Sequence, residues 1–148
     1  MKVIGIKNGK DTFGWVIVEG EAREDATVLD FKEVSAPSGT RPEQLSWLRR
    51  ELIEVLERQD VDYASLRLAE AGRTGTANFG RAEMDGVTQA TLADLHVPMK
   101  GYKSATVRSA FGKTKPIADA VIESLPCVSS SAKTRRDQLV VAIAQFPI

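Results

Sequence analysis

The residues that decide the fold are Val3-Ile4-Gly5-Ile6-Lys7-Asn8-Gly9-Lys10, followed by Thr12-Phe13-Gly14-Trp15-Val16-Ile17-Val18. Both runs are apolar and rich in β-branched residues, and an Asn-Gly pair separates them. This pattern is typical of two strands joined by a tight turn. A third run of the same kind, residues 26–31, follows within reach of a hairpin. We therefore expect the chain to begin as an antiparallel three-stranded meander.

Helical and strand patterns alternate after this meander. Thr40 with Glu43 three residues later forms a capping box, which predicts a helix over 41–58 with leucines along one face. A strand is expected over about 64–70, a helix over 79–95 and a short strand over 97–102. Helices at 104–111, 116–125 and 134–146 complete the chain. The order predicts one α/β domain, residues 1–148, in which helices flank a five-stranded mixed sheet.

The composition fits a single compact domain without metal or disulfide support. The chain has 148 residues, 43% of them hydrophobic, and folding at this size buries roughly 70% of the surface of the unfolded chain. Its one cysteine, Cys127, cannot form an internal disulfide and is expected to be a buried structural thiol. We find no apolar run long enough to span a membrane and no secretory leader. These features predict a soluble cytoplasmic protein.

The charges balance overall but are unevenly distributed. Lysine plus arginine and aspartate plus glutamate each number 20, so the net charge gives no sign of nucleic-acid binding. The segment from residue 100 onward is nevertheless basic. It carries Lys100, Lys103, Arg108, Lys113, Lys115, Lys133, Arg135 and Arg136 against Asp119, Glu123 and Asp137.

Motifs for several other chemistries are missing from the sequence. It has no nucleophile with an adjacent base, no glycine-rich phosphate loop and no Cys/His set spaced for zinc. The helix at 79–95 does carry a stripe of small residues, Ala82, Gly86, Ala90 and Ala93. The stripe is compatible with close packing on the sheet or with close approach to a ligand, and the apolar residues beside it favour packing.

Several short motifs occur in the order and spacing of a known family. Gly5-Ile6-Lys7-Asn8-Gly9 with Gly14-Trp15 resembles the Gly-Ile-Asp-Pro-Gly and Gly-Tyr of the RuvC family of Holliday junction resolvases. Further matches are Asp62-Tyr63, Gly80-Arg81-Ala82, Gly86-Val87, Ala105-Thr106-Val107-Arg108 and Asp137-Gln138-Leu139-Val140-Val141-Ala142-Ile143-Ala144. The resemblance covers nearly the whole chain and implies an RNase H-like fold.

The resemblance also implies a catalytic site, from which this sequence departs. Family members cleave DNA with carboxylates that hold two magnesium ions. Lys7 stands at the position of the first-strand aspartate. Two unit charges about 4 Å apart interact by about 4 kcal/mol at an effective dielectric near 20, and a divalent ion doubles this. An aspartate at this position would attract a magnesium ion, whereas the Lys7 ammonium repels it by a comparable energy. We therefore predict that a magnesium site centred on this strand does not form.

The other expected acids are only partly retained. An ungapped comparison places Arg67 where the family has its glutamate, whereas a shift of three residues places Glu70 there. Residues 67 and 70 point to opposite faces of a regular strand, so only one can face the site. Asp137 matches the last aspartate, and Thr134 replaces its partner acid. Glu70 and Asp137 are therefore the remnant catalytic acids, and the metal ligands only if the site is active.

Three hypotheses about function follow. The leading one is a nucleic-acid-binding relative that is catalytically inactive or impaired, acts in DNA recombination or repair, has DNA as its expected partner and needs no cofactor. The second is an active Mg- or Mn-dependent endonuclease, and the third is a protein-interaction module. The resemblance also implies a possible homodimer. The residues expected to hold nucleic-acid phosphates are Lys7, Arg73, Arg81, Lys100, Lys103, Arg108, Lys113 and Lys115.

Overall fold

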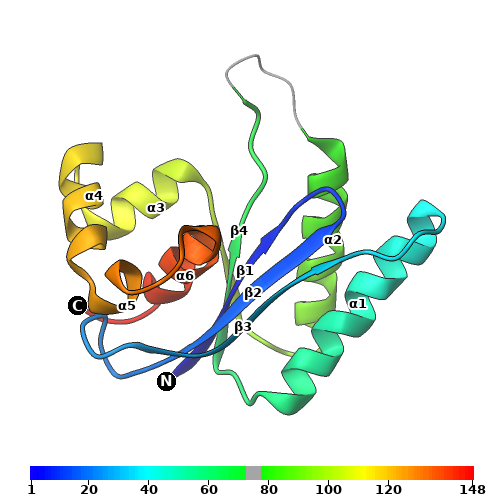
Figure 1. The fold of residues 1–148 in the computed structure, drawn as a ribbon, viewed down its shortest axis with the longest axis horizontal. Coiled ribbons are helices and arrows are strands. Elements are labelled where there is room, and N and C mark those ends of the chain that lie inside the picture. Colours follow the sequence, from blue (N-terminus) through cyan, green and yellow to red (C-terminus); the bar gives the residue numbers. More distant parts are fainter. Residues whose placement is uncertain (73–77) are drawn as a thin grey trace.

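The fold is a sheet of five strands flanked by helices (Figure 1), described for residues 1–72 and 78–148 of a computed structural model. The strands are β1 (Lys2–Asn8), β2 (Thr12–Glu19), β3 (Thr27–Ser35), β4 (Tyr63–Arg67) and β5 (Met99–Tyr102). The helices are α1 (Arg41–Arg58), α2 (Phe79–Asp94), α3 (Ser104–Phe111), α4 (Lys115–Ser124), α5 (Pro126–Ser129), a 3-10 turn η1 (Lys133–Arg135) and α6 (Arg136–Ile143).

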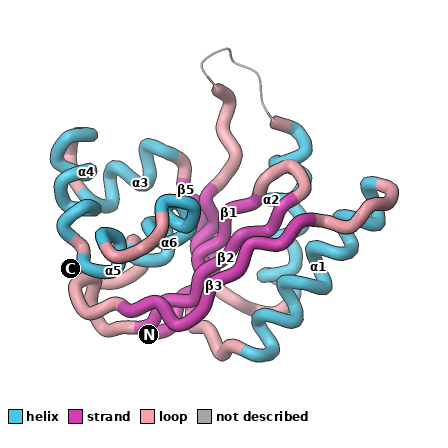
Figure 2. Tube along the Cα trace, viewed as in Figure 1, coloured by secondary structure: helices cyan, strands magenta, loops and turns pink. Residues whose placement is uncertain are grey.

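The sheet has the mixed topology that the sequence predicted. Its strand order is β3-β2-β1-β4-β5 (Figure 2). The pairs β1/β2 and β2/β3 are antiparallel and form the meander, whereas β1/β4 and β4/β5 are parallel. The carboxyl ends of β1, β4 and β5 therefore meet at one edge of the sheet.

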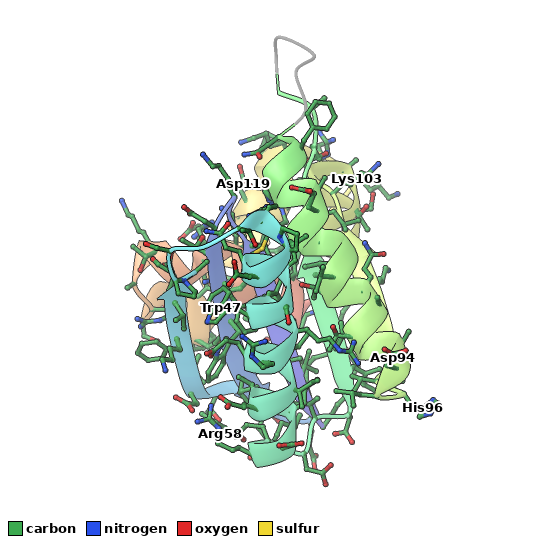
Figure 3. All side chains as sticks on the ribbon, turned by 90° about the vertical axis from the view of Figure 1, so that its right-hand side faces the viewer. Trp47, Arg58, Asp94, His96, Lys103 and Asp119 are labelled. Carbon is green, nitrogen blue, oxygen red and sulfur yellow. The ribbon has the colours of Figure 1, made fainter. Side chains whose placement is uncertain are left out.

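The alternation of side chains along the strands separates two cores. In β1, Ile4 and Ile6 belong to the core under α1 and α2, whereas Val3 belongs to the core under α3 to α6. In β2, Trp15 and Val16 divide in the same way. Figure 3 shows α1 and α2 lying side by side over the first face. Helices thus cover both faces of the sheet, while most residues of the edge strand β3 remain exposed.

The sequence predicted the ends of some helices and strands correctly and those of others incorrectly. The capping box of Thr40 and Glu43 is present, and α1 has the predicted bounds. The strand expected over 64–70 ends at Arg67, and the helix expected over 134–146 is a 3-10 turn followed by α6. The short helix α5 was not predicted. Cys127 is buried as expected. None of the described helices is long and apolar enough to cross a bilayer.

The packing prediction for the small residues of α2 is wrong. Ala82, Gly86, Ala90 and Ala93 are all exposed. The face of α2 that is buried instead consists of Met84, Asp85, Thr88, Thr91 and Leu92. The helix packs through its larger residues, and a carboxylate lies among them.

Candidate nucleic-acid interface at the carboxyl edge of the sheet

Two glycines allow the start of α6 to approach the first hairpin. A Cβ atom added at Gly5 would lie 1.9 Å from the carbonyl oxygen of Gln138, and one at Gly14 would lie 3.2 Å from Gln138 Nε2. Gly14 is also the antiparallel partner of Lys7. Because residues 5 and 7 lie on the same face of β1, this contact brings the first turn of α6 beside Lys7.

An ion pair joins that turn to β1. The Lys7 ammonium donates a hydrogen bond to Asp137 Oδ2, although Asp137 lies 130 positions further along the chain. Partial burial raises the pKa of Asp137, but the hydrogen bond and charge of Lys7, with the charges of Arg67 and Arg81, outweigh it and hold the pKa below its usual value. Asp137 is therefore an ionised carboxylate that already has a cationic partner.

A second cation lies next to Lys7. Arg67 ends β4 and is the parallel partner of Lys7 in the sheet. Its guanidinium donates to Glu70 Oε2 at 3.2 Å, to Ser104 Oγ at 2.8 Å and to the Tyr102 carbonyl at 3.2 Å. The Ser104 hydroxyl donates to the same Glu70 oxygen at 2.6 Å. This hydrogen bond, reinforced by the Ser104 N–H and by Arg67, lowers the pKa of Glu70.

The opposite face of β1 carries a buried polar network. Asp85, on α2, accepts hydrogen bonds from Asn8 Nδ2 at 3.1 Å and from the Ala69 N–H at 2.7 Å. Burial raises the pKa of Asp85 despite these bonds and the nearby charges of Arg81 and Arg67. Arg81 in turn donates to the Arg67 carbonyl at 3.0 Å. The network fixes the backbone that leaves β4, and with it Arg67 and Glu70.

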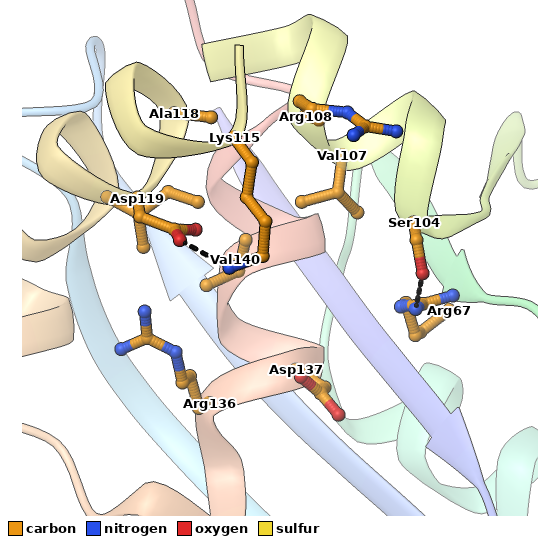
Figure 4. Close-up of a pocket in the computed structure, with 11 residues that line it drawn as sticks. Arg67, Ser104, Val107, Arg108, Lys115, Ala118, Asp119, Arg136, Asp137 and Val140 are labelled. Carbon is orange, nitrogen blue, oxygen red and sulfur yellow. Dashed lines mark hydrogen bonds and ion pairs between the residues drawn. The ribbon is translucent and has the colours of Figure 1, made fainter. Parts of the chain in front are cut away.

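A cavity of about 390 Å³ opens beside Asp137 (Figure 4). It lies between the end of β4 and helices α3, α4 and α6. Arg67, Arg108, Lys115 and Arg136 line it, against two carboxylates, Asp119 and Asp137. The lining therefore carries a net positive charge next to the Lys7–Asp137 pair.

Sequence relatives confirm the predicted resemblance. The crossover junction endodeoxyribonuclease RuvC of Chloroflexus aggregans is 31% identical to this chain over 114 residues, which cover 74% of this chain and 67% of the relative. The chain belongs to the RuvC family. RuvC of Ruegeria pomeroyi is 23% identical over 148 residues, covering 97% of this chain and 89% of that protein. No family model matches the chain.

Solved structures support the RuvC fold. The complex of Thermus thermophilus RuvC with Holliday junction substrate gives a TM-score of 0.76 at 19% identity and covers 97% of this chain and 92% of that one. The yeast mitochondrial Holliday junction resolvase gives a TM-score of 0.59 at 10% identity, covering 96% and 76%. At these identities the likeness establishes the RNase H-like fold alone.

The residues at this edge do not suit a divalent metal ion of the kind implied by the RuvC resemblance. Magnesium requires several oxygen ligands in near-octahedral geometry. Here one carboxylate, Asp137, is paired with Lys7, and Arg67 lies in register beside it. Thr134 lies in the exposed turn η1 and supplies no carboxylate. Within residues 1–72 and 78–148, no three Asp, Glu, His or Cys side chains come together as a metal-binding group.

The predicted site residues of this RuvC relative do not all gather at one place. Lys7, Arg81, Arg108 and Lys115 lie around the carboxyl edge or its cavity. Lys103 precedes α3, and the Lys100 ammonium lies over the Tyr102 ring, 5.2 Å from its centroid. Lys113 lines a different cavity, with Arg23 and Phe111, and its contact with nucleic acid stays a prediction. Arg73 lies outside the described residues.

The strand boundary decides which residue faces Lys7. Because β4 ends at Arg67, Glu70 lies beyond the strand, where Ser104 and Arg67 bind its carboxylate. The expected extension of the strand to residue 70 is therefore wrong. A metal-binding role for Glu70 with Asp137 stays a prediction.

Sequence reasoning missed three contributors to this edge. Ser104 and Arg136 line the cavity, and Asp85 anchors the network under β1. A signal for Asp85 was present, since it falls with Met84, Thr88 and Leu92 on the helical repeat of buried positions. Ser104 and Arg136 have no such signal, because their position depends on how α3 and α6 pack.

Proposed function

We propose that this RuvC-family chain binds DNA through its sugar-phosphate backbone and is catalytically inactive or strongly impaired. The observation that carries the proposal is the Lys7–Asp137 ion pair with Arg67 in register beside Lys7. Two fixed cations occupy the edge where the family resemblance calls for carboxylates. The local charge therefore favours phosphate oxygens over a divalent cation.

The basic residues around this edge supply the affinity. Arg108 and Lys115 project from α3 and α4 toward the same cavity as Arg67. Lysine and arginine contacts to phosphates release counterions, so such binding weakens steeply with salt. Contacts of this kind carry little sequence information. We therefore expect recognition of DNA shape, with branched or single-stranded DNA as the partner.

The proposal is tested by measuring binding and cleavage on the same substrates. Fluorescence anisotropy with a labelled four-way junction, a duplex and a single strand between 50 and 200 mM salt should show weaker binding as salt increases. The double variant Arg108→Gln/Lys115→Gln should reduce the slope of log K against log salt by about 2. Arg50→Gln/Arg58→Gln, on α1 across the sheet, is the matched control and should leave the slope unchanged.

Cleavage decides between the proposal and an active nuclease. Incubation of the same DNAs with Mg²⁺ or Mn²⁺ should give no product, or much less than an active resolvase gives. Efficient cleavage that Asp137→Asn abolishes would establish the alternative, a metal-dependent endonuclease that uses Asp137 and Glu70. Absence of binding to every DNA would favour a protein-interaction module. The homodimer stays a prediction that sedimentation can test.

A further inference from the structure

The cavity beside Asp137 is lined by side chains of two chemical kinds. The guanidinium groups of Arg67, Arg108 and Arg136 lie on different sides of it (Figure 4). The aliphatic part of the lining, called the aliphatic wall, comes from α3, α4 and α6. Its residues are Val107, Ala118, Ile122 and Val140. A row of cations on a flat surface would suffice for backbone phosphates, whereas this cavity also opens onto an edge of the core under α3 to α6, to which Ala118, Ile122 and Val140 belong.

The cations of the cavity differ in how far they are already engaged. Lys115 donates to Asp119 at 2.8 Å, Arg136 pairs with Glu123, and Arg67 is held by Glu70 and Ser104. Within the described parts of the chain, no hydrogen bond or ion pair engages the guanidinium of Arg108. Arg108 is therefore the cation best able to accept a new anionic partner.

We propose that this cavity binds one nucleoside phosphate unit, with the phosphate on Arg108 and the base against the aliphatic wall. A volume of about 390 Å³ lies within the usual range for small-molecule sites, roughly 300 to 1,000 Å³. Inorganic phosphate would leave the aliphatic wall unused, and an apolar ligand would make no use of the Arg108 charge. A nucleotide uses both the charge and the aliphatic wall, and arginine planes also stack on bases.

The unit has two possible sources with the same chemistry. It is either an unstacked nucleotide of a bound DNA strand or a free nucleotide. The first source rests on the proposed DNA binding, whereas the second does not. Stacked bases of an intact duplex are turned inward, so the DNA source requires a branch point, an end or a single strand.

Methyl NMR of the whole chain distinguishes these cases. The probes are dAMP, inorganic phosphate, a single-stranded oligonucleotide and the same oligonucleotide with abasic sites. We expect dAMP or the base-containing strand to shift the methyl resonances of Val107, Ile122 and Val140. Inorganic phosphate and the abasic strand should leave them in place. A shift with dAMP alone identifies a free nucleotide as the source.

Two variants guard against misfolding as an explanation. Arg108→Gln, at an exposed helical position, should weaken binding of the responding probe by about tenfold or more, because a charge-assisted bond is lost. Val107→Phe should fill the cavity and abolish the methyl shifts. Val121→Phe is its matched control, since this valine lines the separate cavity near Arg23. It should retain the shifts.

The outcomes separate this inference from the proposed function. DNA binding by anisotropy without methyl shifts from any base-containing probe would overturn the nucleotide cavity and leave backbone binding intact. Equal shifts from base-containing and abasic strands would also overturn it. Methyl shifts with dAMP in a chain that binds no DNA would support the cavity while removing the proposed DNA function.

Discussion

Lys7 controls the ionisation of Asp137, so we expect Lys7→Met to raise the pKa of that carboxyl. The variant removes the hydrogen bond and charge that oppose the effect of burial. Carboxyl ¹³C NMR titration measures the change directly. Lys10→Met, an exposed lysine in the adjacent turn, is the control. An Asp137 pKa equal to that of the wild type in Lys7→Met would show that the ion pair does not set it.

The same ion pair makes stability depend on pH in a defined direction. A carboxyl whose pKa is depressed by folding adds stability above its unfolded pKa of about 3.9, and this stability is lost as pH falls through the folded value. The Lys7 and Asp137 side chains are 39% and 48% exposed, so solvent screening limits the contribution to about 1 kcal/mol or less. The loss of stability in Lys7→Met should therefore be present at pH 7 and shrink in acid.

At the scale of the elements, the contact of β1 with α6 depends on a glycine, Gly5, which has no side chain at the point of contact. Gly5→Ala places a Cβ atom 1.9 Å from a backbone oxygen of α6, which a side-chain rotation cannot relieve. We expect a loss of about 2–3 kcal/mol in the free energy of unfolding measured with urea. Gly86→Ala, at an exposed position of α2 with nothing within 4 Å, should instead gain about 0.5–1 kcal/mol. Equal effects of the two substitutions would contradict this close approach.

The elements differ in how well the sequence predicts them, for physical reasons. Helix α1 begins at a local capping box, so its start follows from neighbouring residues. The end of β4 depends on pairing with β1 and β5, which no local pattern encodes. In α6, consecutive residues from Gln138 to Ile143 are all buried, so no amphipathic repeat marks its limits.

In the candidate site, too, the sequence predicts what local motifs mark and misses what depends on tertiary packing. The resemblance found Lys7 because it interrupts a recognisable strand motif, and found Asp137 because an apolar helix follows it. The bond between the two, across 130 positions of the chain, depends on how closely α6 packs against β1. Asp85 was missed because carboxylates are expected in water unless a partner is known, and Asn8 becomes its partner only after folding.

Across the whole molecule, Arg23 joins the β2–β3 connection to the C-terminal segment. Its guanidinium donates to the carbonyls of Ala110 at 2.9 Å and Phe146 at 3.1 Å, and lies 4.5 Å from the centroid of the Phe111 ring. In Arg23→Lys the positive charge remains, but a single ammonium group cannot reach both carbonyl groups as the planar guanidinium does. We expect a loss of about 1–3 kcal/mol in stability and faster amide exchange near residue 146.

Hydrogen exchange with mass spectrometry and thermal unfolding test this role of Arg23. Arg50→Lys, on the exposed surface of α1, serves as the control and should change neither measurement. If Arg23→Lys lowered the melting temperature without faster exchange in the C-terminal segment, Arg23 would stabilise the fold in some other way than by joining these parts.

The division of the sheet into two cores has a consequence for synthesis on the ribosome. Every buried residue of the core under α1 and α2 precedes residue 93, whereas most of the opposite core follows residue 110. At roughly 5–20 residues per second, the later helices emerge seconds after the strands they cover. During that interval the nascent chain exposes Val3, Val16 and Val18 on an uncovered face of the sheet. The ion pair of Lys7 cannot form, because Asp137 has not yet been synthesised. A holding chaperone would find its binding surface there.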